Sequence, residues 1–181
     1  MALWVGTRLS NPAVLTNVGS FPVSGGGMAW GVAVQGKYAY LAARSDGTYI
    51  LNVSNPGSVT RVATIPSTSQ AMDVVVQGHY VYIADYDAGI KIYDVSTPAA
   101  PVFLGAYTMT SQTFDRLAVS GNTIWAVAST YRVVALNAAN TAEIPLLAQH
   151  ACAGGCNDVL PFGNLVYVAS GTFLEVLDIE P

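Results

Sequence analysis

The residues with the most chemical potential lie in one short stretch near the C-terminus, HACAGGCND (150–158). His150, Cys152, Cys156 and Asp158 are all of types that bind zinc. Structural zinc sites usually take four ligands from paired short spacings, and this single Cys-x3-Cys has no second pair elsewhere in the chain. The two cysteines could instead form a disulfide or remain small buried thiols. We predict a Cys152–Cys156 disulfide, no metal and no cofactor.

No catalytic site can be recognised. A cysteine and a histidine in one stretch could act as nucleophile and base, but no third residue that would orient the base can be named. The segment DYDAG (85–89) begins like a calcium loop but lacks the distal bidentate Glu. Turn chemistry explains its Asp and Gly residues equally well. We therefore predict that the chain is not an enzyme.

Composition narrows the range of partners. Charged residues make up only 10% of the 181 residues and hydrophobic residues 52%, whereas an ordinary domain is about 25% charged. The seven basic residues are scattered singly, so no basic patch for nucleic acid exists. No apolar run approaches the ~18 residues of a membrane helix. Low charge favours association with other protein chains.

The elements that would position these residues come from an internal repeat. Four segments share an apolar strand, a glycine turn and a second apolar, aromatic strand. Their turn glycines, Gly36, Gly78, Gly121 and Gly163, are 42, 43 and 42 residues apart. The four segments are GVAVQGKYAYLAA (31–43), DVVVQGHYVYIAD (73–85), DRLAVSGNTIWAVA (115–128) and DVLPFGNLVYVAS (158–170).

Each unit contains four short strand signals, which in the second unit are residues 73–76, 80–84, 90–95 and 102–107. Both faces of these strands are apolar, which is typical of a sheet packed between two other sheets, and no stretch has a helical period. We predict an all-β fold, a β-propeller of about four four-stranded blades in a single domain. The blades are expected at residues 28–67, 70–109, 113–151 and 156–181.

One segment carries a family resemblance. GIKIYDVSTPAAP (89–101) resembles the LVIVD repeat, whose core reads roughly G-L-x-I-x-D-V-S-x-P-x-x-P. Residues 48–56 follow the same pattern with Asn52 in place of the Asp, and residues 174–179 keep Asp178. The resemblance implies propeller blades and an extracellular or cell-surface protein. Because the family has no common catalytic residue, it assigns none here.

The last unit lacks a fourth strand, and residues 1–22 offer one. Residues 13–21 align with residues 102–107, each with a glycine two positions before an aromatic residue. We predict that this N-terminal strand completes the last blade and closes the ring. The strand could instead complete the last blade of a neighbouring molecule, which would give closed oligomers or a filament. A fragment of a larger propeller is a third interpretation.

Candidate ligand-binding residues are the acids that open the first strand of a unit, Asp73, Asp115 and Asp158, together with Trp30. The first strand of a propeller blade lines the central channel, so these residues would surround one mouth of it. Capping of loop amides, blade by blade, explains the same acids, and a repeated residue favours that structural role.

These observations favour an extracellular or cell-surface module that binds protein. Its expected partner is itself, in a homo-oligomer or a filament built by strand donation. Binding of a small ligand or carbohydrate at the channel mouth is the alternative function. We expect no nucleic-acid partner and no membrane span.

Overall fold

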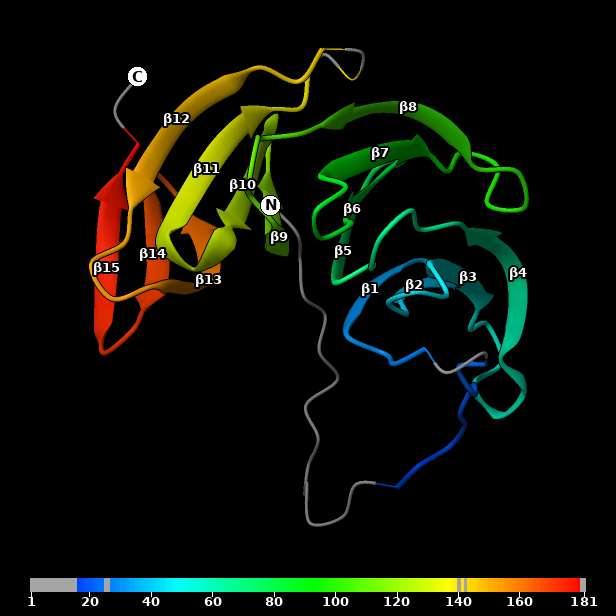
Figure 1. Cartoon of the computed structure of the whole chain (residues 1–181). Helices are drawn as coiled ribbons and strands as arrows, with labels where there is room; N and C mark the ends of the chain where they lie inside the picture. The colour runs from blue at the N-terminus through cyan, green and yellow to red at the C-terminus, as the bar shows by residue number, and fades with distance from the viewer. Residues whose placement is uncertain (1–15, 25–26, 140, 142, 180–181) are drawn as a thin grey trace.

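The computed structural model describes residues 16–24, 27–139, 141 and 143–179. Its strands form four antiparallel sheets, each built from consecutive strands of the chain. Figure 1 shows these sheets as blades of an open arc, with the first and the last blade at its two ends. The all-β prediction and the propeller-blade architecture are confirmed.

The blades follow the predicted repeat. Blade 1 comprises β1 (Gly31–Gln35), β2 (Tyr38–Ala42), β3 (Thr48–Asn52) and β4 (Thr60–Ile65). Blade 2 comprises β5 (Asp73–Gln77), β6 (Tyr80–Ala84), β7 (Ile90–Asp94) and β8 (Val102–Tyr107). Blade 3 comprises β9 (Phe114–Ser120), β10 (Thr123–Ala128), β11 (Arg132–Asn137) and β12 (Leu146–Ala151). Blade 4 has β13 (Cys156–Phe162), β14 (Leu165–Ser170) and β15 (Phe173–Asp178).

Within the described residues, helix is confined to two short 3-10 turns, η1 (Pro56–Ser58) and η2 (Ser129–Tyr131). In the described part of the chain, no helix has the length and apolar character needed to cross a membrane.

The glycine turns are built alike and link neighbouring blades. Gly78 joins β5 to β6 with φ of 62°, a conformation that glycine adopts at no steric cost. Its carbonyl accepts a hydrogen bond of 2.6 Å from the side-chain Nε2 of Gln35 in blade 1. One blade further, Gln77 donates to the carbonyl of Gly121 over 3.0 Å. The repeat therefore sets both the hairpin and the polar contact between the first strands of neighbouring blades. We call these first strands, β1, β5, β9 and β13, the inner strands, and the last strands, β4, β8 and β12, the outer strands.

Apolar faces stacked between consecutive blades form the core. We call the side of a blade that faces the next blade along the chain its front face, and the opposite side its back face. The front face of blade 2 carries Tyr82, Ile90 and Ile92, which pack with Phe114 and Ile124 of blade 3. Fully burying one such side chain contributes about 1.5–3 kcal/mol, so the stacked faces dominate the stability of the arc.

A buried ion pair ties the connection between blades 1 and 2 to the second sheet. Asp85 follows β6 and pairs with Lys91 of β7, and both are buried. The Ser67 hydroxyl and the Thr68 amide also donate to Asp85. Burial alone would raise the pKa of Asp85, but the hydrogen bonds from Lys91, Ser67 and Thr68 outweigh it and hold this pKa below its ordinary value.

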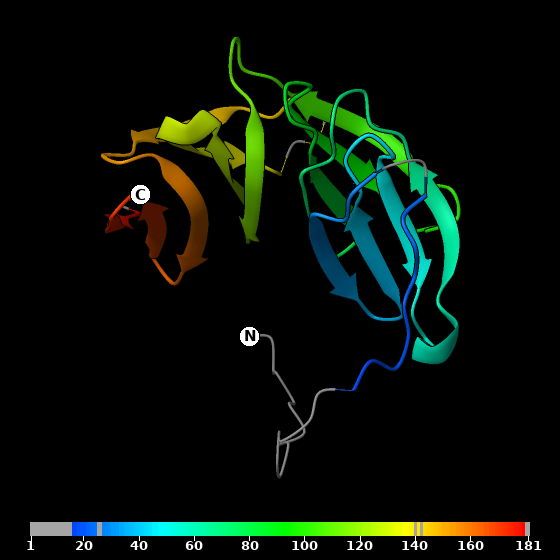
Figure 2. The same ribbon diagram turned by 60° about the horizontal axis from the view of Figure 1, so that its bottom comes forward.

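The strand predicted to complete the last blade is not formed by the described residues. Residues 16–21 form no strand, residues 13–15 lie outside the described part, and blade 4 has three strands there. Phe21 packs edge-on against Tyr49 of blade 1, with ring centroids 6.0 Å apart. Burial of this aromatic ring on blade 1 holds the segment at the opposite end of the arc from blade 4, as Figure 2 also shows.

We predict that Asp85→Asn destabilises the fold by about 3 kcal/mol, because it leaves the Lys91 ammonium buried without its counter-charge. Urea unfolding followed by circular dichroism measures this. Asp87→Asn, two residues further in the same loop and exposed, is the control and should change stability by less than about 0.5 kcal/mol. Equal effects of the two substitutions would contradict a structural role for the ion pair.

Candidate functional site

Asp73, one of the predicted channel acids, has a structural role. Its carboxylate accepts a 2.9 Å hydrogen bond from the Val74 amide and a 3.0 Å bond from the Leu117 amide of blade 3. Burial raises the pKa of Asp73, and the negative charge of Asp158 adds to that effect. The carboxylate thus joins blade 2 to blade 3, as amide capping predicts.

Asp115 is not the equivalent of Asp73. Asp73 stands five residues before its turn glycine and Asp115 six, and Asp115 is the unpaired residue of a β-bulge between Phe114 and Arg116. Arg116 therefore takes the register position that Asp73 has in blade 2. Asp158 is the true equivalent, and it accepts a 3.0 Å bond from the Val159 amide in the same way.

The four predicted ligand-binding residues consequently line two different hollows. Asp73 and Asp158 lie on the concave side of the arc, in a hollow of about 510 Å³ along the innermost strands. Trp30 and Asp115 border a second hollow of about 440 Å³, with Arg44 and Arg116. The Arg44 guanidinium lies 5.2 Å from the centre of the Trp30 ring. The structure therefore does not gather the acids into one ring of carboxylates.

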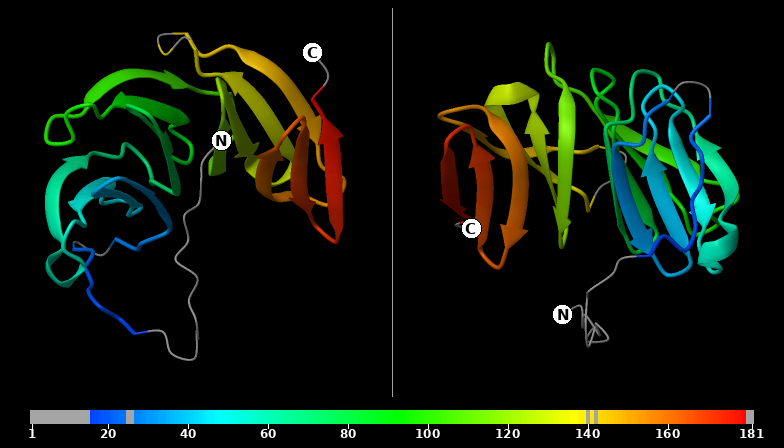
Figure 3. Two further views of the ribbon diagram at one scale, coloured as in Figure 1. Left: turned by 180° about the vertical axis from the view of Figure 1, so that it is seen from behind. Right: turned by 90° about the horizontal axis from the view of Figure 1, so that it is seen from below.

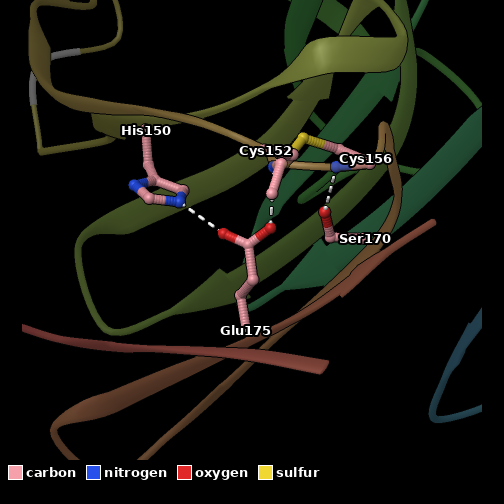
Figure 4. The surroundings of a disulfide bond; sticks show 7 residues. His150, Cys152, Cys156, Ser170 and Glu175 are labelled. Carbon is pink, nitrogen blue, oxygen red and sulfur yellow. Dashed lines mark hydrogen bonds and ion pairs between the residues drawn. A yellow bond between two sulfur atoms is a disulfide. The ribbon is translucent and has the colours of Figure 1, made fainter. Parts of the chain in front are cut away.

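The chemically rich stretch near the C-terminus forms a clip between blades 3 and 4. Cys152 and Cys156 are joined in a disulfide with their Cα atoms 5.6 Å apart, as Figure 4 shows. The Gly154 amide donates to the Ser170 hydroxyl at 3.2 Å. Among the described residues, no three His, Cys, Asp or Glu side chains converge as a metal site would require.

Glu175 is the centre of the polar contacts beside this clip. It stands on β15, and its carboxylate meets His150 Nε2 of β12 at 2.6 Å and the Ala153 amide at 2.9 Å. Hydrogen bonding from the Ser170 hydroxyl, the Ala153 amide and His150 lowers the pKa of Glu175 from 4.5 to about 2. Glu175 and His150 thus form an ion pair between the last two blades when the imidazole is protonated.

The front face of blade 4 is uncovered. Its Leu174 and Val176 hold the register positions that Ile90 and Ile92 hold in blade 2. The two isoleucines are 0% exposed, whereas Leu174 is 68% and Val176 50% exposed. Leu160 and Tyr167 border a shallow hollow of about 190 Å³ on the same face. Blade 4 therefore presents to solvent the surface that blades 1 to 3 bury.

The back face of blade 1 is uncovered along its inner strand. Val32 of β1 holds the position of Val74 in β5, yet Val32 is 64% exposed and Val74 1%. Val34 of the same strand is also exposed. Towards the outer side, Phe21 and Val23 cover Tyr49 and Leu51. Figure 3 shows blade 1 and blade 4 as the two ends of the arc, both without a neighbouring sheet.

The outer edge of blade 4 is a third open element. Among the described residues, strand β15 pairs with β14 on one side only, whereas β3, β7 and β11 are each flanked by two strands. Beside it, a hollow of about 420 Å³ is lined by Trp125 and Ala148 of blade 3 and by Val176 and Ile179. An outer strand of blade 4 would lie beside β15 at this hollow. An unpaired strand edge readily adds another strand.

These features define the class of protein: an arc of propeller blades that ends in two uncovered faces and one free strand edge. Residues 26–65 and 69–109, which coincide with blades 1 and 2, match the LVIVD repeat model. These two blades therefore carry LVIVD repeats. No curated protein matches it in sequence.

Solved structures place the arc among propellers. The computationally designed Ika4 protein is 14% identical, with a TM-score of 0.74 over 92% of this chain and 100% of that one. The designed Ika8 protein is 14% identical, with a TM-score of 0.69 over 83% of this chain and 46% of that one. The β-propeller domain of Cps50 (Swd1) from Myceliophteria thermophila is 11% identical, with a TM-score of 0.61 over 78% of this chain and 49% of that one. The chain thus spans all of the first and about half of the other two. At these identities the likeness shows the fold, and the repeat fold suggests a protein-interaction module.

Sequence reasoning missed two parts of this site. The His150–Glu175 contact joins residues of different blades, and nothing in the repeat pattern indicates that these two residues meet. The exposed front face of blade 4 carries the same apolar pattern as the buried front faces. Its signal was the missing fourth strand of the last unit, which we assigned to the N-terminal segment alone.

We predict that Glu175→Gln lowers stability in a pH-dependent way. The pKa of Glu175 is lower in the folded chain, about 2, than its ordinary 4.5, so the carboxylate stabilises the fold above pH 4.5. That contribution is lost as the pH falls from 4.5 towards 2. Urea midpoints measured between pH 2 and pH 7 should therefore differ most between wild type and variant near neutrality and converge near pH 2.

Asp178→Asn is the matched control for this experiment. Asp178 is on the same strand, but its carboxylate accepts a hydrogen bond from the neutral side-chain amide of Asn164. A gap between Glu175→Gln and wild type that stayed constant down to pH 2 would contradict the assignment.

Proposed function

We propose that the chain is a non-enzymatic interaction module that associates with further copies of itself through the two ends of its arc. The single observation that supports this most strongly is the exposure of Leu174 and Val176, whose register equivalents Ile90 and Ile92 are 0% exposed. Contiguous apolar surface on a soluble domain usually marks an interaction site. Blade 1, at the other end, offers Val32 and Val34.

The chemistry of the two ends supports a second copy as the partner. Every internal junction of the arc joins the front face of one blade to the back face of the next, for example Tyr40 and Ile50 of blade 1 to Val81 and Ile83 of blade 2. The uncovered front face of blade 4 and the uncovered back face of blade 1 are the missing halves of one more such junction. Low charge removes the repulsion that would oppose it.

An extracellular or cell-surface location is part of this proposal. The Cys152–Cys156 disulfide favours an oxidising compartment, where such bonds persist. The LVIVD resemblance points in the same direction.

Light scattering coupled to size-exclusion chromatography tests the self-association. The wild type should elute with a mass above the 18.9 kDa of one chain. Val34→Lys at one end and Leu174→Lys at the other should each raise the dissociation constant at least tenfold, because each buries an unpaired charge at the junction.

Val102→Lys is the matched control, since Val102 is an exposed valine on the outer strand of blade 2. It should associate like the wild type. A wild type that stays at 18.9 kDa at high concentration, or a Val102→Lys variant that dissociates as readily as the other two, would refute the proposal.

A second candidate function, binding of a carbohydrate, is favoured by the hollow of about 440 Å³ beside Trp30. Trp30 is 44% exposed, and its indole ring offers an apolar platform on which a sugar ring can stack. Arg44 and Arg116 border it and can donate to hydroxyl or carboxylate oxygens.

A glycan array tests this function. The wild type should bind a subset of glycans that Trp30→Ala no longer binds, because the stacking surface is gone. Tyr131→Ala removes an exposed ring elsewhere, on η2, and should leave binding unchanged. An array without signal for the wild type would exclude carbohydrate binding at this hollow.

A further inference from the structure

We propose that two copies of the chain close into a single ring, in which the fourth blade of each copy is completed by residues 16–24 of the other. The proposal rests on the self-association proposed above and adds its geometry and its stoichiometry. Each of the two identical junctions would contain a composite blade, made of β13, β14 and β15 from one copy and the N-terminal segment of its partner.

Residues 16–24 lie on the back face of blade 1, where the outer strand of a preceding blade would lie. The back face of blade 2 shows the corresponding arrangement: it is covered by β4, the outer strand of blade 1, whose Val62 and Ile65 pack against Val81 and Ile83. On the back face of blade 1, Phe21 and Val23 lie in the place of such a strand and pack against Tyr49 and Leu51. The segment thus covers blade 1 as an outer strand covers the next blade.

The polar anchors at the two places also correspond. After β4 the chain continues Ile65-Pro66, and Thr68 meets the Lys91 ammonium on β7 at 2.6 Å. The N-terminal segment continues Phe21-Pro22, and Ser24 meets the Tyr49 hydroxyl on β3 at 3.2 Å. Tyr49 and Lys91 hold the same register position in their blades. Residues 16–24 therefore follow the path of an outer strand and of its connection to the next blade.

The close approach of the segment to its own blade fixes it there. A side chain at Gly19 would collide with the carbonyl oxygen of Pro56 in η1, so glycine lets the backbone lie against this turn. The segment is consequently held on blade 1 while its outward side has no sheet beside it among the described residues.

Blade 4 supplies the sheet that this segment lacks. Its edge strand β15 has no outer partner in the described residues, and its front face exposes Leu160, Leu174 and Val176. Seated against the back face of blade 1 of another copy, this front face would cover the partner's Val32 and the partner's Val34. The β7–β8 pairing gives the register of the composite blade: Leu174 opposite the partner's Phe21 and Val176 opposite the partner's Gly19.

An inner-strand hydrogen bond would lock the same junction. The Asp73 carboxylate of blade 2 accepts a hydrogen bond from the amide of Leu117 in blade 3. Leu117 follows Arg116, which holds in blade 3 the register position that Asp73 holds in blade 2. In blade 4 the same register position is held by Asp158. In blade 1 it is held by Gly31, and Val32 is the residue that follows. The Asp158 carboxylate would accordingly accept a hydrogen bond from the amide of the partner's Val32.

The extent of the arc indicates two copies. The chain superposes on 46% of the Ika8 chain and 49% of the Swd1 propeller domain chain. One more arc of the same curvature supplies the remaining half. Two copies related by a two-fold axis make both junctions identical and leave no open end, which a filament would keep.

Cysteine cross-linking of the variant Thr16→Cys/Asp178→Cys tests the composite blade. The register places Asp178 opposite the partner's Thr16, as Asp94 lies opposite Val102 in blade 2. Neighbouring antiparallel residues have Cα atoms about 4.5–5.5 Å apart, within the range that a disulfide spans. Oxidation should give a covalent dimer as the largest product on a non-reducing gel. Ser96→Cys/Asp178→Cys, with the first cysteine on an exposed turn of blade 2, should not cross-link.

Other outcomes of the cross-linking experiment distinguish failure of the two-copy ring from failure of the proposed self-association. A ladder of covalent oligomers would show an open filament and overturn the two-copy ring, while self-association would stand. A cross-linked monomer would show that one chain closes on itself, which would overturn both. Oligomers that light scattering detects but that do not cross-link would overturn the composite blade alone.

Asp158→Asn provides an independent readout at the inner strand. Losing a hydrogen bond to a charged acceptor should weaken the dimer by about tenfold or more, with the circular dichroism spectrum of the chain unchanged. Asp115→Asn, displaced from this register by the bulge, should dissociate like the wild type. Equal dissociation constants for Asp158→Asn and the wild type would overturn the inner-strand contact.

Discussion

The structure depends on one constraint: a blade of this repeat is apolar on both faces and cannot bury either of them by itself. Ile90 and Ile92 are buried only because blade 3 covers them, and Val81 and Ile83 only because blade 1 does. The free energy of the fold is therefore stored mainly between sheets, at about 25 cal/mol per Å² of apolar area removed from water. An arc of such blades leaves two apolar faces without a neighbouring sheet among the described residues.

The polar contacts between blades select the geometry of stacking and contribute less to its strength. Asp73 and Gln35 each reach the next blade at a fixed register, so they align neighbouring inner strands. A hydrogen bond of this kind contributes about 0.5–1.5 kcal/mol, or about 1.5–3 kcal/mol when one group is charged. A sheet that slid by one residue would turn its side chains to the wrong face and lose these bonds as well. The rotation from blade to blade is thus specified by sequence at the inner strands, where the arc has its smallest radius.

Much of the fold could be predicted from the sequence, because the repeated apolar segments and turn glycines indicate the strands and the turns between them. The glycines from Gly36 to Gly163 located every inner hairpin, and the pattern of 89–101 identified the LVIVD repeat. The bulge in β9 could not be predicted, because the one unpaired residue, Asp115, leaves the apolar pattern almost unchanged. Asp115 lies in this bulge, one residue outside the position predicted for it. The destination of the N-terminal segment also escaped prediction: its likeness to β8 identifies an outer strand but does not say to which sheet it belongs.

The two ends of the arc differ in how they are secured, and the difference follows from their position in the chain. In a stacked array the terminal repeats have a single neighbour and are the least stable. Blade 1 has the N-terminal segment packed on its back face, with Phe21 and Ser24 both contacting Tyr49. Blade 4 has no such cover on its front face among the described residues, and instead holds to blade 3 through the Cys152–Cys156 clip and the Glu175 contacts. These attachments fix the position of blade 4 without covering Leu174 or Val176. A covalent and ionic clip beside the open front face of blade 4 keeps that face in a fixed orientation, and a preorganised surface loses less conformational entropy on association than a mobile one.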